Sequence, residues 1–189
     1  MSTSSHKQQL LNALYEPFRG CTGCHFKMPK ATRIVWGDGT PDSSIIFIGE
    51  APGKDEDIQG KPFVGRSGKL LNRILSSLES AREKVFITNI VKCRPPKNRR
   101  PLPQEIEISR PLLYEQIKII QPKVICTLGS SALEALIGKQ VKITQTRGKP
   151  FAWHGIIVLP TYHPAYILRN PKELDTLSAD IKQALSLSL

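Results

Sequence analysis

Apolar residues follow two alternating patterns along the chain, continuous runs and repeats at helical spacing. Continuous runs are typical of strands buried on both faces of a parallel sheet. The predicted strands are residues 44–49, 85–89, 123–128 and 156–159. The repeats predict helices at residues 8–18, 67–78, 104–120, 130–137 and 172–187, with Pro111 as a kink or break in the third of them. Strands that alternate with helices predict an α/β fold of three layers, in which a central four-stranded parallel sheet is flanked by helices.

Polar segments follow three of the four predicted strands. Gly49-Glu50-Ala51-Pro52-Gly53 follows the first strand, Asn89 closes the second, and Thr161-Tyr162-His163-Pro164 follows the fourth. In a parallel sheet, ligands bind at the edge formed by the carboxyl ends of the strands. We therefore expect these three segments to converge on one site.

The overall composition indicates a globular protein with a basic surface. The length of 189 residues favours one domain, residues 1–189, with a short polar extension at about residues 1–7. The formal charge of +11 indicates either a polyanionic partner, nucleic acid before a membrane surface, or only a basic surface. The polar N-terminus is unlike a signal peptide, and no apolar run approaches the roughly 20 residues of a membrane span. We therefore expect a cytosolic protein whose cysteines stay reduced.

Three features could carry chemistry, and each also has a plainer interpretation. Residues 50–65 combine a strand-end carboxylate, a Pro-Gly turn and Phe63, which suits a planar ligand but also fits an ordinary surface loop. Asn89 can donate and accept a hydrogen bond at once, as reading the edge of a pyrimidine requires, or it can simply close a strand. His163 lies in a turn just past a strand, where a histidine is either catalytic or structural.

The cysteines indicate a metal site better than disulfides in a reducing compartment. Cys21 and Cys24 are separated by two residues and can bind one metal or one corner of a cluster, and a Pro-rich loop can bring Cys93 to them. A dithiol redox pair is the alternative, but no predicted strand leads into the pair. Cys126 lies within a predicted strand and is expected to be a buried core residue.

Four sequence motifs occur in order along the chain. They are Gly-Glu-Ala-Pro-Gly at 49–53, Gly-Lys-Pro-Phe-Val-Gly at 60–65, Thr-Asn-Ile-Val-Lys-Cys-Arg-Pro-Pro at 88–96 and His-Pro-Ala at 163–165. Together, over about residues 21–169, they resemble the family 4, or iron–sulfur, uracil-DNA glycosylases. The resemblance implies a four-stranded parallel sheet flanked by helices, in agreement with the apolar pattern.

The resemblance also implies an enzyme of base-excision repair in a bacterial or archaeal cytosol. Such an enzyme flips uracil out of single- or double-stranded DNA and hydrolyses its N-glycosidic bond, leaving an abasic site without a lyase step. It implies a monomer with no membrane partner, and it leaves a replication clamp as an open possibility.

Individual residues acquire roles from the same resemblance. Glu50 corresponds to a carboxylate near the sugar and the attacking water, either a general base or only an electrostatic group, because Ala51 stands where family 1 enzymes have Asp. Phe63 corresponds to the ring that stacks on the flipped base. Asn89 corresponds to the amide that pairs with the edge of uracil and rejects cytosine, and His163 to the donor that faces uracil O2.

Further residues are implied around this set. Glu56 corresponds to a pocket residue near uracil C5, where it helps to reject the methyl group of thymine. Gly49 and Ala51 are expected among the substrate-binding residues. A loop is expected to enter the minor groove, with one of its last two residues filling the gap left by the base. This loop is the segment from Pro164 to Arg169, and the residue that fills the gap is Leu168 or Arg169.

The cofactor implied by the resemblance is a 4Fe-4S cluster, and one ligand position departs from the family. Cys21, Cys24 and Cys93 match three ligands, but Ser109 stands at the usual position of the fourth cysteine. A cluster could persist with the Ser109 oxygen or an exogenous ligand on the fourth iron, it could be labile and often lost, or the protein could lack one. We favour a cluster with weakened ligation. None of these ligands belongs to the expected base pocket, so we expect catalysis in every case.

Two other functions are weighed against a monofunctional glycosylase. A non-catalytic member that binds DNA, or senses through a cluster, would not need Glu50, Phe63, Asn89 and His163 together. A related type of glycosylase traps the abasic sugar through a histidine in a basic loop after the second strand. Residues 95–103 are basic but contain no histidine, which disfavours that type.

Overall fold

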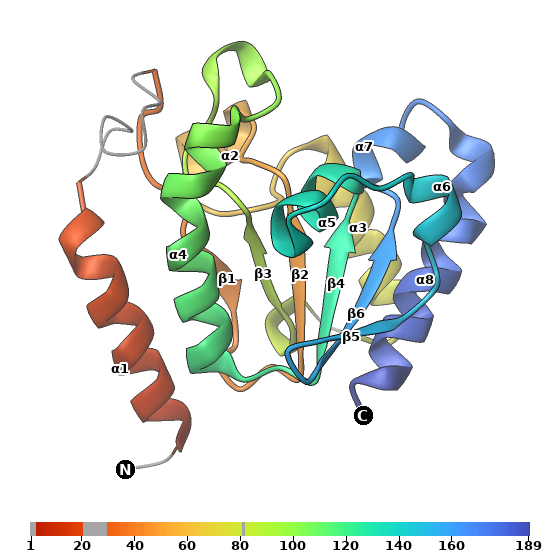
Figure 1. Cartoon of the computed structure of the whole chain (residues 1–189), viewed down its shortest axis with the longest axis horizontal. Coiled ribbons are helices and arrows are strands. Elements are labelled where there is room, and N and C mark those ends of the chain that lie inside the picture. Colours follow the sequence, from red (N-terminus) through yellow and green to blue (C-terminus); the bar gives the residue numbers. More distant parts are fainter. Residues whose placement is uncertain (1–2, 21–29, 81) are drawn as a thin grey trace.

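The computed structural model describes residues 3–20, 30–80 and 82–189, which form a mixed sheet flanked by helices (Figure 1). The sheet has six strands in the order β1-β3-β2-β4-β6-β5. The strands are β1 (Asp38–Gly39), β2 (Ile45–Gly49), β3 (Phe86–Asn89), β4 (Val124–Leu128), β5 (Phe151–Trp153) and β6 (Ile156–Thr161). The four central strands run parallel, and the edge strands β1 and β5 pair antiparallel with β3 and β6.

The predicted α/β fold is confirmed, but the sheet is larger than the four strands that the sequence predicted. The four apolar runs form the central strands β3, β2, β4 and β6. The two additional strands lie at the edges, where β1 has only two residues and β5 is partly exposed. β1 contains no apolar residue, and the apolar run of β5 is only three residues long, too short to predict a strand.

Helices connect the strands and cover both faces of the sheet. The α-helices are α1 (Thr3–Tyr15), α2 (Lys54–Gln59), α3 (Arg66–Ser77), α4 (Pro103–Ile120), α5 (Ser130–Ile137), α6 (Ile143–Thr146), α7 (Pro164–Ile167) and α8 (Leu174–Leu187). Short 3-10 turns occur at Glu16–Phe18, Arg82–Lys84, Pro96–Asn98 and Pro171–Glu173. In the described part of the chain, no helix is both long enough and apolar enough to cross a membrane.

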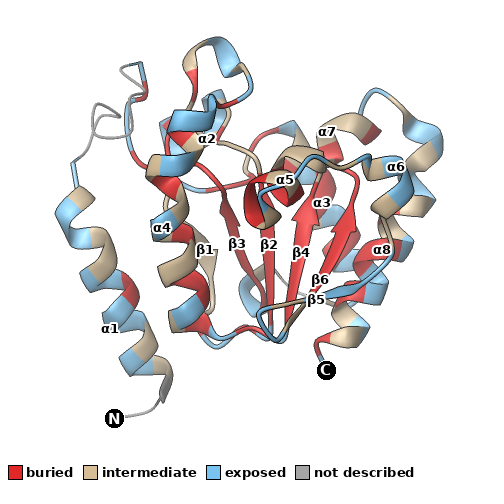
Figure 2. Ribbon diagram, in the orientation of Figure 1, coloured by how far each residue is buried: buried red, intermediate tan, exposed pale blue. Residues whose placement is uncertain are grey.

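The core is divided by the sheet because successive side chains of a strand point to opposite faces. Ile46 and Ile48 of β2 pack in one cluster with buried residues of α1, α4 and α5. Ile45 and Phe47 pack in a second cluster with α3 and α8. Strands β2 and β4 are buried along their whole length, as the red centre of Figure 2 shows. Ligands can therefore reach the central strands only at their ends.

Two predicted helices have different bounds or continuity in the structure. Helix α1 begins at Thr3, so the described part of the expected polar extension at residues 1–7 is helical. Pro111 lies inside α4 and does not end it. Proline removes one backbone donor from a helix. The buried side chains of Leu113 and Ile117, which follow Pro111, keep this helix packed on the core.

Helix α2 forms within residues 50–65, which the sequence indicated as a loop. It contains no helical repeat of apolar residues, and its one large apolar side chain, Ile58, is exposed. A polar contact attaches it instead, because buried Asp57 accepts a hydrogen bond from the backbone N–H of Thr32 at 2.9 Å.

Candidate active site

A cavity of about 700 Å³ lies at the carboxyl ends of the parallel strands. Residues that follow β2, β3 and β6 line it, so the three polar segments do meet at one place. The predicted site residues in its lining are Glu50, Ala51, Glu56, Phe63, Asn89, His163 and Arg169. Three other predicted residues, Gly49, Pro164 and Leu168, lie outside this lining.

Gly49 has no side chain, and the side chains of Asn89 and Phe63 occupy the space beside it. It ends β2 directly beside Asn89 of β3. A Cβ atom at residue 49 would lie 2.5 Å from Asn89 Oδ1 and 2.5 Å from Phe63 Cζ, closer than real Cβ atoms come. Only glycine therefore permits this amide and this ring to stand side by side.

Asn89 presents a buried amide with unused hydrogen-bonding capacity. Its side chain is 1% exposed, and within the described ranges its Oδ1 has no hydrogen-bond partner. A buried polar atom without a partner is costly, so such atoms in native proteins call for an explanation. A ligand that donates to this oxygen in the cavity would remove the cost.

Lys92 binds the backbone of Asn89 and was not identified as a site residue from the sequence. Its fully buried Nζ donates to the backbone oxygen of Asn89 at 2.9 Å, to Thr88 Oγ1 at 2.7 Å and to Gln116 Oε1 at 2.6 Å. Burial lowers the pKa of Lys92 well below its ordinary value of 10.5. The one available signal was a lysine within an otherwise apolar stretch between a strand end and Cys93.

Phe63 places its ring beside His163, and its backbone adopts an unusual conformation to do so. The two ring centroids lie 5.8 Å apart, with an angle of 35° between the planes. The φ angle of Phe63 is 52°, in the left-handed region. This conformation costs a residue with a side chain about 1–2 kcal/mol, so other contacts must hold the loop.

Glu56 provides some of these contacts. Its Oε1 accepts hydrogen bonds from the backbone N–H groups of Val64 at 2.9 Å and Gly65 at 2.8 Å, and its Oε2 accepts one from Gly53 at 3.0 Å. The carboxylate thus joins the start of α2 to the residues that follow Phe63. Glu56 lines the cavity while most of its hydrogen-bonding capacity is directed at the backbone.

His163 follows β6, and a backbone hydrogen bond fixes its tautomer. Its Nδ1 accepts from the N–H of Ala165 at 3.0 Å, so the neutral ring carries its proton on Nε2. Burial and, to a lesser extent, the positive charge of Arg169 lower the pKa of His163 from 6.5 to about 4. At pH 7 the ring is therefore a neutral Nε2–H donor.

We expect an NMR titration of the His163 ring to give a midpoint near the pKa of about 4. As the pH falls from 6.5 towards 4, the unfolded chain binds a proton that the native ring does not, so the free energy of unfolding falls in this window. The variant Arg169→Gln removes a nearby positive charge and should raise the midpoint. A wild-type midpoint at the ordinary value would contradict the buried, neutral state.

A model of the uracil DNA glycosylase superfamily matches residues 36–186, which include every residue of the cavity lining. The chain belongs to the uracil-DNA glycosylase superfamily. The family resemblance inferred from the four motifs is thereby confirmed.

Curated relatives within the uracil-DNA glycosylase superfamily match most of the chain. A Type-4 uracil-DNA glycosylase of Thermotoga maritima is 45% identical over 166 residues, which cover 87% of this chain and 86% of the relative. A Type-4 uracil-DNA glycosylase of Sulfurisphaera tokodaii is 46% identical over 167 residues, covering 84% and 76%. A third, from Saccharolobus solfataricus, is 44% identical over 189 residues, covering 93% and 87%.

The cavity of this uracil-DNA glycosylase superfamily member has a basic rim. Lys54, Arg66, Arg99 and Arg169 line it together with the residues described above. Leu168, next to Arg169, has an exposed side chain at the end of α7. Positive side chains around a concave site attract and orient the phosphates of a nucleic acid.

The expected cluster ligands are only partly visible in this uracil-DNA glycosylase superfamily member, because Cys21 and Cys24 lie outside the described residues. Cys93 and Ser109 are both buried, the latter in α4, and Ser109 Oγ has no hydrogen-bond partner among the residues that the structure describes. The described residues contain no group of three or more His, Cys, Asp or Glu side chains suited to a metal ion. Cys126 is buried in β4 as predicted, and burial raises the pKa of its thiol.

Proposed function

We propose that the chain is a monofunctional uracil-DNA glycosylase of base-excision repair, acting as a monomer and a single domain. It flips uracil out of single- or double-stranded DNA and hydrolyses the N-glycosidic bond, leaving an abasic site. One observation carries the proposal: an aromatic ring, an amide whose oxygen has no partner among the described residues, and a neutral histidine donor line the same cavity. The names of the Type-4 relatives support the same substrate.

Base recognition is assigned to three side chains. The ring of Phe63 provides a face on which a flipped pyrimidine stacks. The amide of Asn89 accepts from uracil N3–H and donates to O4, which satisfies the oxygen that otherwise has no partner. Cytosine presents the opposite donor and acceptor at these two positions. Glu56, which also lines the cavity, is assigned to the C5 side of the base, where it would help to reject the methyl group of thymine.

Bond cleavage is assigned to His163 and Glu50. Uracil leaves as an anion, and the Nε2–H of His163 donates to O2, where negative charge develops. A neutral donor suits this role because it holds its proton throughout the step. The carboxylate of Glu50 stabilises the positive charge of the sugar and orients water for attack. Ala51 of the same segment lines the pocket, and Gly49 before it leaves the space for Asn89 and Phe63.

DNA binding is assigned to the segment that follows His163 and to the basic rim. Pro164 begins α7, and exposed Leu168 with Arg169 follows at its end, next to the cavity. Insertion of an apolar or basic side chain into the duplex would fill the gap left by the flipped base. The basic rim would contact the phosphates on either side.

We further propose that Cys21, Cys24, Cys93 and Ser109 hold an iron–sulfur cluster of the 4Fe-4S type with weakened ligation. The buried, unpartnered hydroxyl of Ser109 fits an oxygen ligand to a fourth iron. Such a cluster, when bound, joins separate segments and takes no part in the cleavage step. Cys93 follows the strand-end segment of Asn89, so its ligation would stabilise the loop beside the base pocket.

Restoring the fourth thiolate is expected to strengthen the cluster. Purified Ser109→Cys should retain more iron and sulfide per chain than wild type after treatment with a chelator, because thiolate is the usual ligand of such clusters. Ser109→Ala should retain less than wild type. Iron analysis and visible absorption measure both, and equal retention in all three proteins would remove Ser109 from the ligand set.

The function is tested by uracil release from an oligonucleotide that contains a single labelled uracil. Matched oligonucleotides with thymine or cytosine at the same position are the controls. Alkali-sensitive cleavage at uracil alone is the expected result. Folded protein that binds the oligonucleotide without releasing uracil would overturn the proposal in favour of a non-catalytic DNA-binding member.

A further inference from the structure

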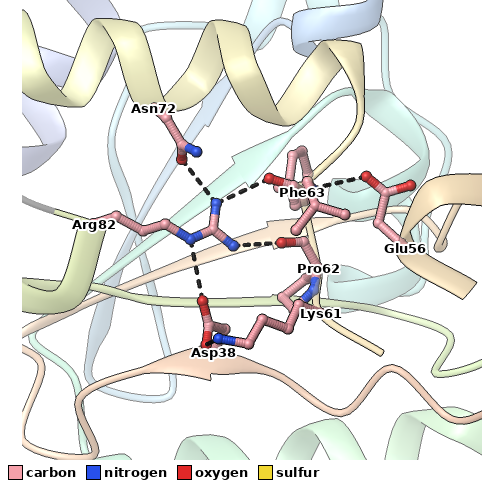
Figure 3. Close-up of polar contacts among 8 residues, drawn as sticks. Asp38, Glu56, Lys61, Pro62, Phe63, Asn72 and Arg82 are labelled. Carbon is pink, nitrogen blue, oxygen red and sulfur yellow. Dashed lines mark hydrogen bonds and ion pairs between the residues drawn. The ribbon is translucent and has the colours of Figure 1, made fainter. Parts of the chain in front are cut away.

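Arg82, in the turn before β3, contacts the backbone of the loop that carries Phe63. Its Nη1 donates to the carbonyl oxygen of Phe63 at 2.9 Å, and its Nη2 donates to the carbonyl oxygen of Pro62 (Figure 3). These are successive carbonyls, and the second belongs to the residue with the left-handed φ of 52°. One guanidinium therefore binds the backbone on both sides of the unusual torsion.

The guanidinium is itself held from two other elements. Its Nε donates to Asp38 Oδ2 in β1 at 3.1 Å, and its Nη1 also donates to Asn72 Oδ1 in α3 at 2.7 Å. The side chain is 19% exposed, and Asp38 lies 3.5 Å from the Nζ of Lys61. A planar group with fixed donors, anchored on both sides, has little freedom to move.

The loop around Phe63 is thus held between two opposite charges. Arg82 binds the carbonyl groups of residues 62 and 63 (Figure 3). Glu56 accepts from the N–H groups of residues 64 and 65. Gly68 of α3 adds a close backbone contact, because a Cβ there would lie 1.9 Å from the carbonyl oxygen of Phe63. These contacts fix the backbone, and the backbone fixes where the ring lies beside His163.

We propose that Arg82 is a positioning residue for the base-stacking ring of Phe63. This inference rests on the proposed function of Phe63. Arg82 does not line the cavity, so it acts on the substrate only through the loop. Its loss lets residue 63 relax from the left-handed region, which moves the ring out of the stacking position while the remaining pocket side chains stay in place.

The test compares Arg82→Gln and Arg82→Lys with wild type. We expect both to lower the single-turnover rate of uracil release by about 10- to 100-fold, because small misplacements at a reaction centre have effects of this size. Affinity for an oligonucleotide with an abasic site, which has no base to stack, should change by less than about twofold. The lysine variant keeps the charge but cannot reach both carbonyl groups. Full activity in Arg82→Lys would show that Arg82 acts only by its charge.

A matched control and a milder variant keep the test interpretable. Lys118→Gln removes the same charge from an exposed pair with Glu115 on α4, and it should leave the rate unchanged. Asn72→Ala removes one anchor of Arg82 and leaves its contacts with the loop, so a smaller loss of rate is expected. Thermal melting identifies variants that fold. An unchanged rate in folded Arg82→Gln, or in Asn72→Ala if the Arg82 variants do not fold, would overturn the proposal.

A double-mutant cycle with Phe63→Ala separates this inference from the function on which it rests. If Arg82 acts through Phe63, adding Arg82→Gln to Phe63→Ala should lower the rate by less than about twofold more. Fully additive losses would refute the positioning role. A normal rate in Phe63→Ala alone would instead refute the stacking role of Phe63, whatever Arg82 does.

Discussion

His163→Ala is expected to lower the single-turnover rate of uracil release by about 100- to 1000-fold, the usual cost of removing one donor to a developing oxyanion. The structure gives the reason, because Ala165 binds Nδ1 and leaves Nε2–H as a neutral donor in the cavity. Affinity for DNA with an abasic site should stay within about twofold, since no charge is lost at neutral pH. Rapid-quench kinetics and fluorescence anisotropy measure the two quantities separately.

A histidine elsewhere provides the control for this prediction. His6 lies in α1, away from the cavity, and His6→Ala should leave both the rate and the affinity unchanged. Rate and affinity that fall together in His163→Ala would mean that His163 only positions α7. In that case the donor to uracil O2 would have to be another group of the lining.

Asn89→Asp is expected to lower the selectivity for uracil over cytosine by about 10- to 100-fold, in line with the 1–3 kcal/mol that a bidentate base contact contributes. Because residue 89 is buried, the pKa of the new carboxyl should be raised. The carboxyl should therefore stay largely protonated. A protonated carboxyl can exchange its donor and acceptor oxygens, and therefore pairs with either base. Release of both bases from matched oligonucleotides gives the ratio.

Asn89→Ala is the matched control for base reading. It removes both hydrogen bonds without offering new ones, so release of uracil should fall and release of cytosine should not rise. An unchanged preference for uracil in Asn89→Asp would remove Asn89 from base recognition. Melting temperatures of the two variants show whether each still folds with the hydrogen bond from Lys92 to the backbone oxygen of residue 89.

The sheet and its helices could be predicted because their signals are local. Each central strand is a continuous apolar run, and helix α3 shows its repeat through Leu70, Leu71 and Ile74, all buried on the sheet. The convergence of residues 50, 89 and 163 then follows from the parallel direction of the strands. Edge strand β1 has no apolar residue and β5 has a run of only three, so neither was predicted.

Features that depend on contacts between distant segments could not be predicted. Helix α2 is tied down by Asp57 through Thr32, a contact with no trace in the apolar pattern. The left-handed torsion of Phe63 and its contact with Arg82 depend on three segments that meet only in the folded chain. Lys92 is buried against the expectation for a lysine, because three oxygens from separate positions surround its ammonium group.

The strand order has a consequence for a chain that is still being synthesised. Asn89 lies on β3 and His163 follows β6, and these strands are separated in the sheet by β2 and β4. The wall that carries His163 cannot exist until β6, one of the last strands to leave the ribosome, has paired with β4. A nascent chain without β6 therefore lacks the donor that we propose for the leaving base. We therefore expect a nascent chain to gain activity only after β6 has paired with β4.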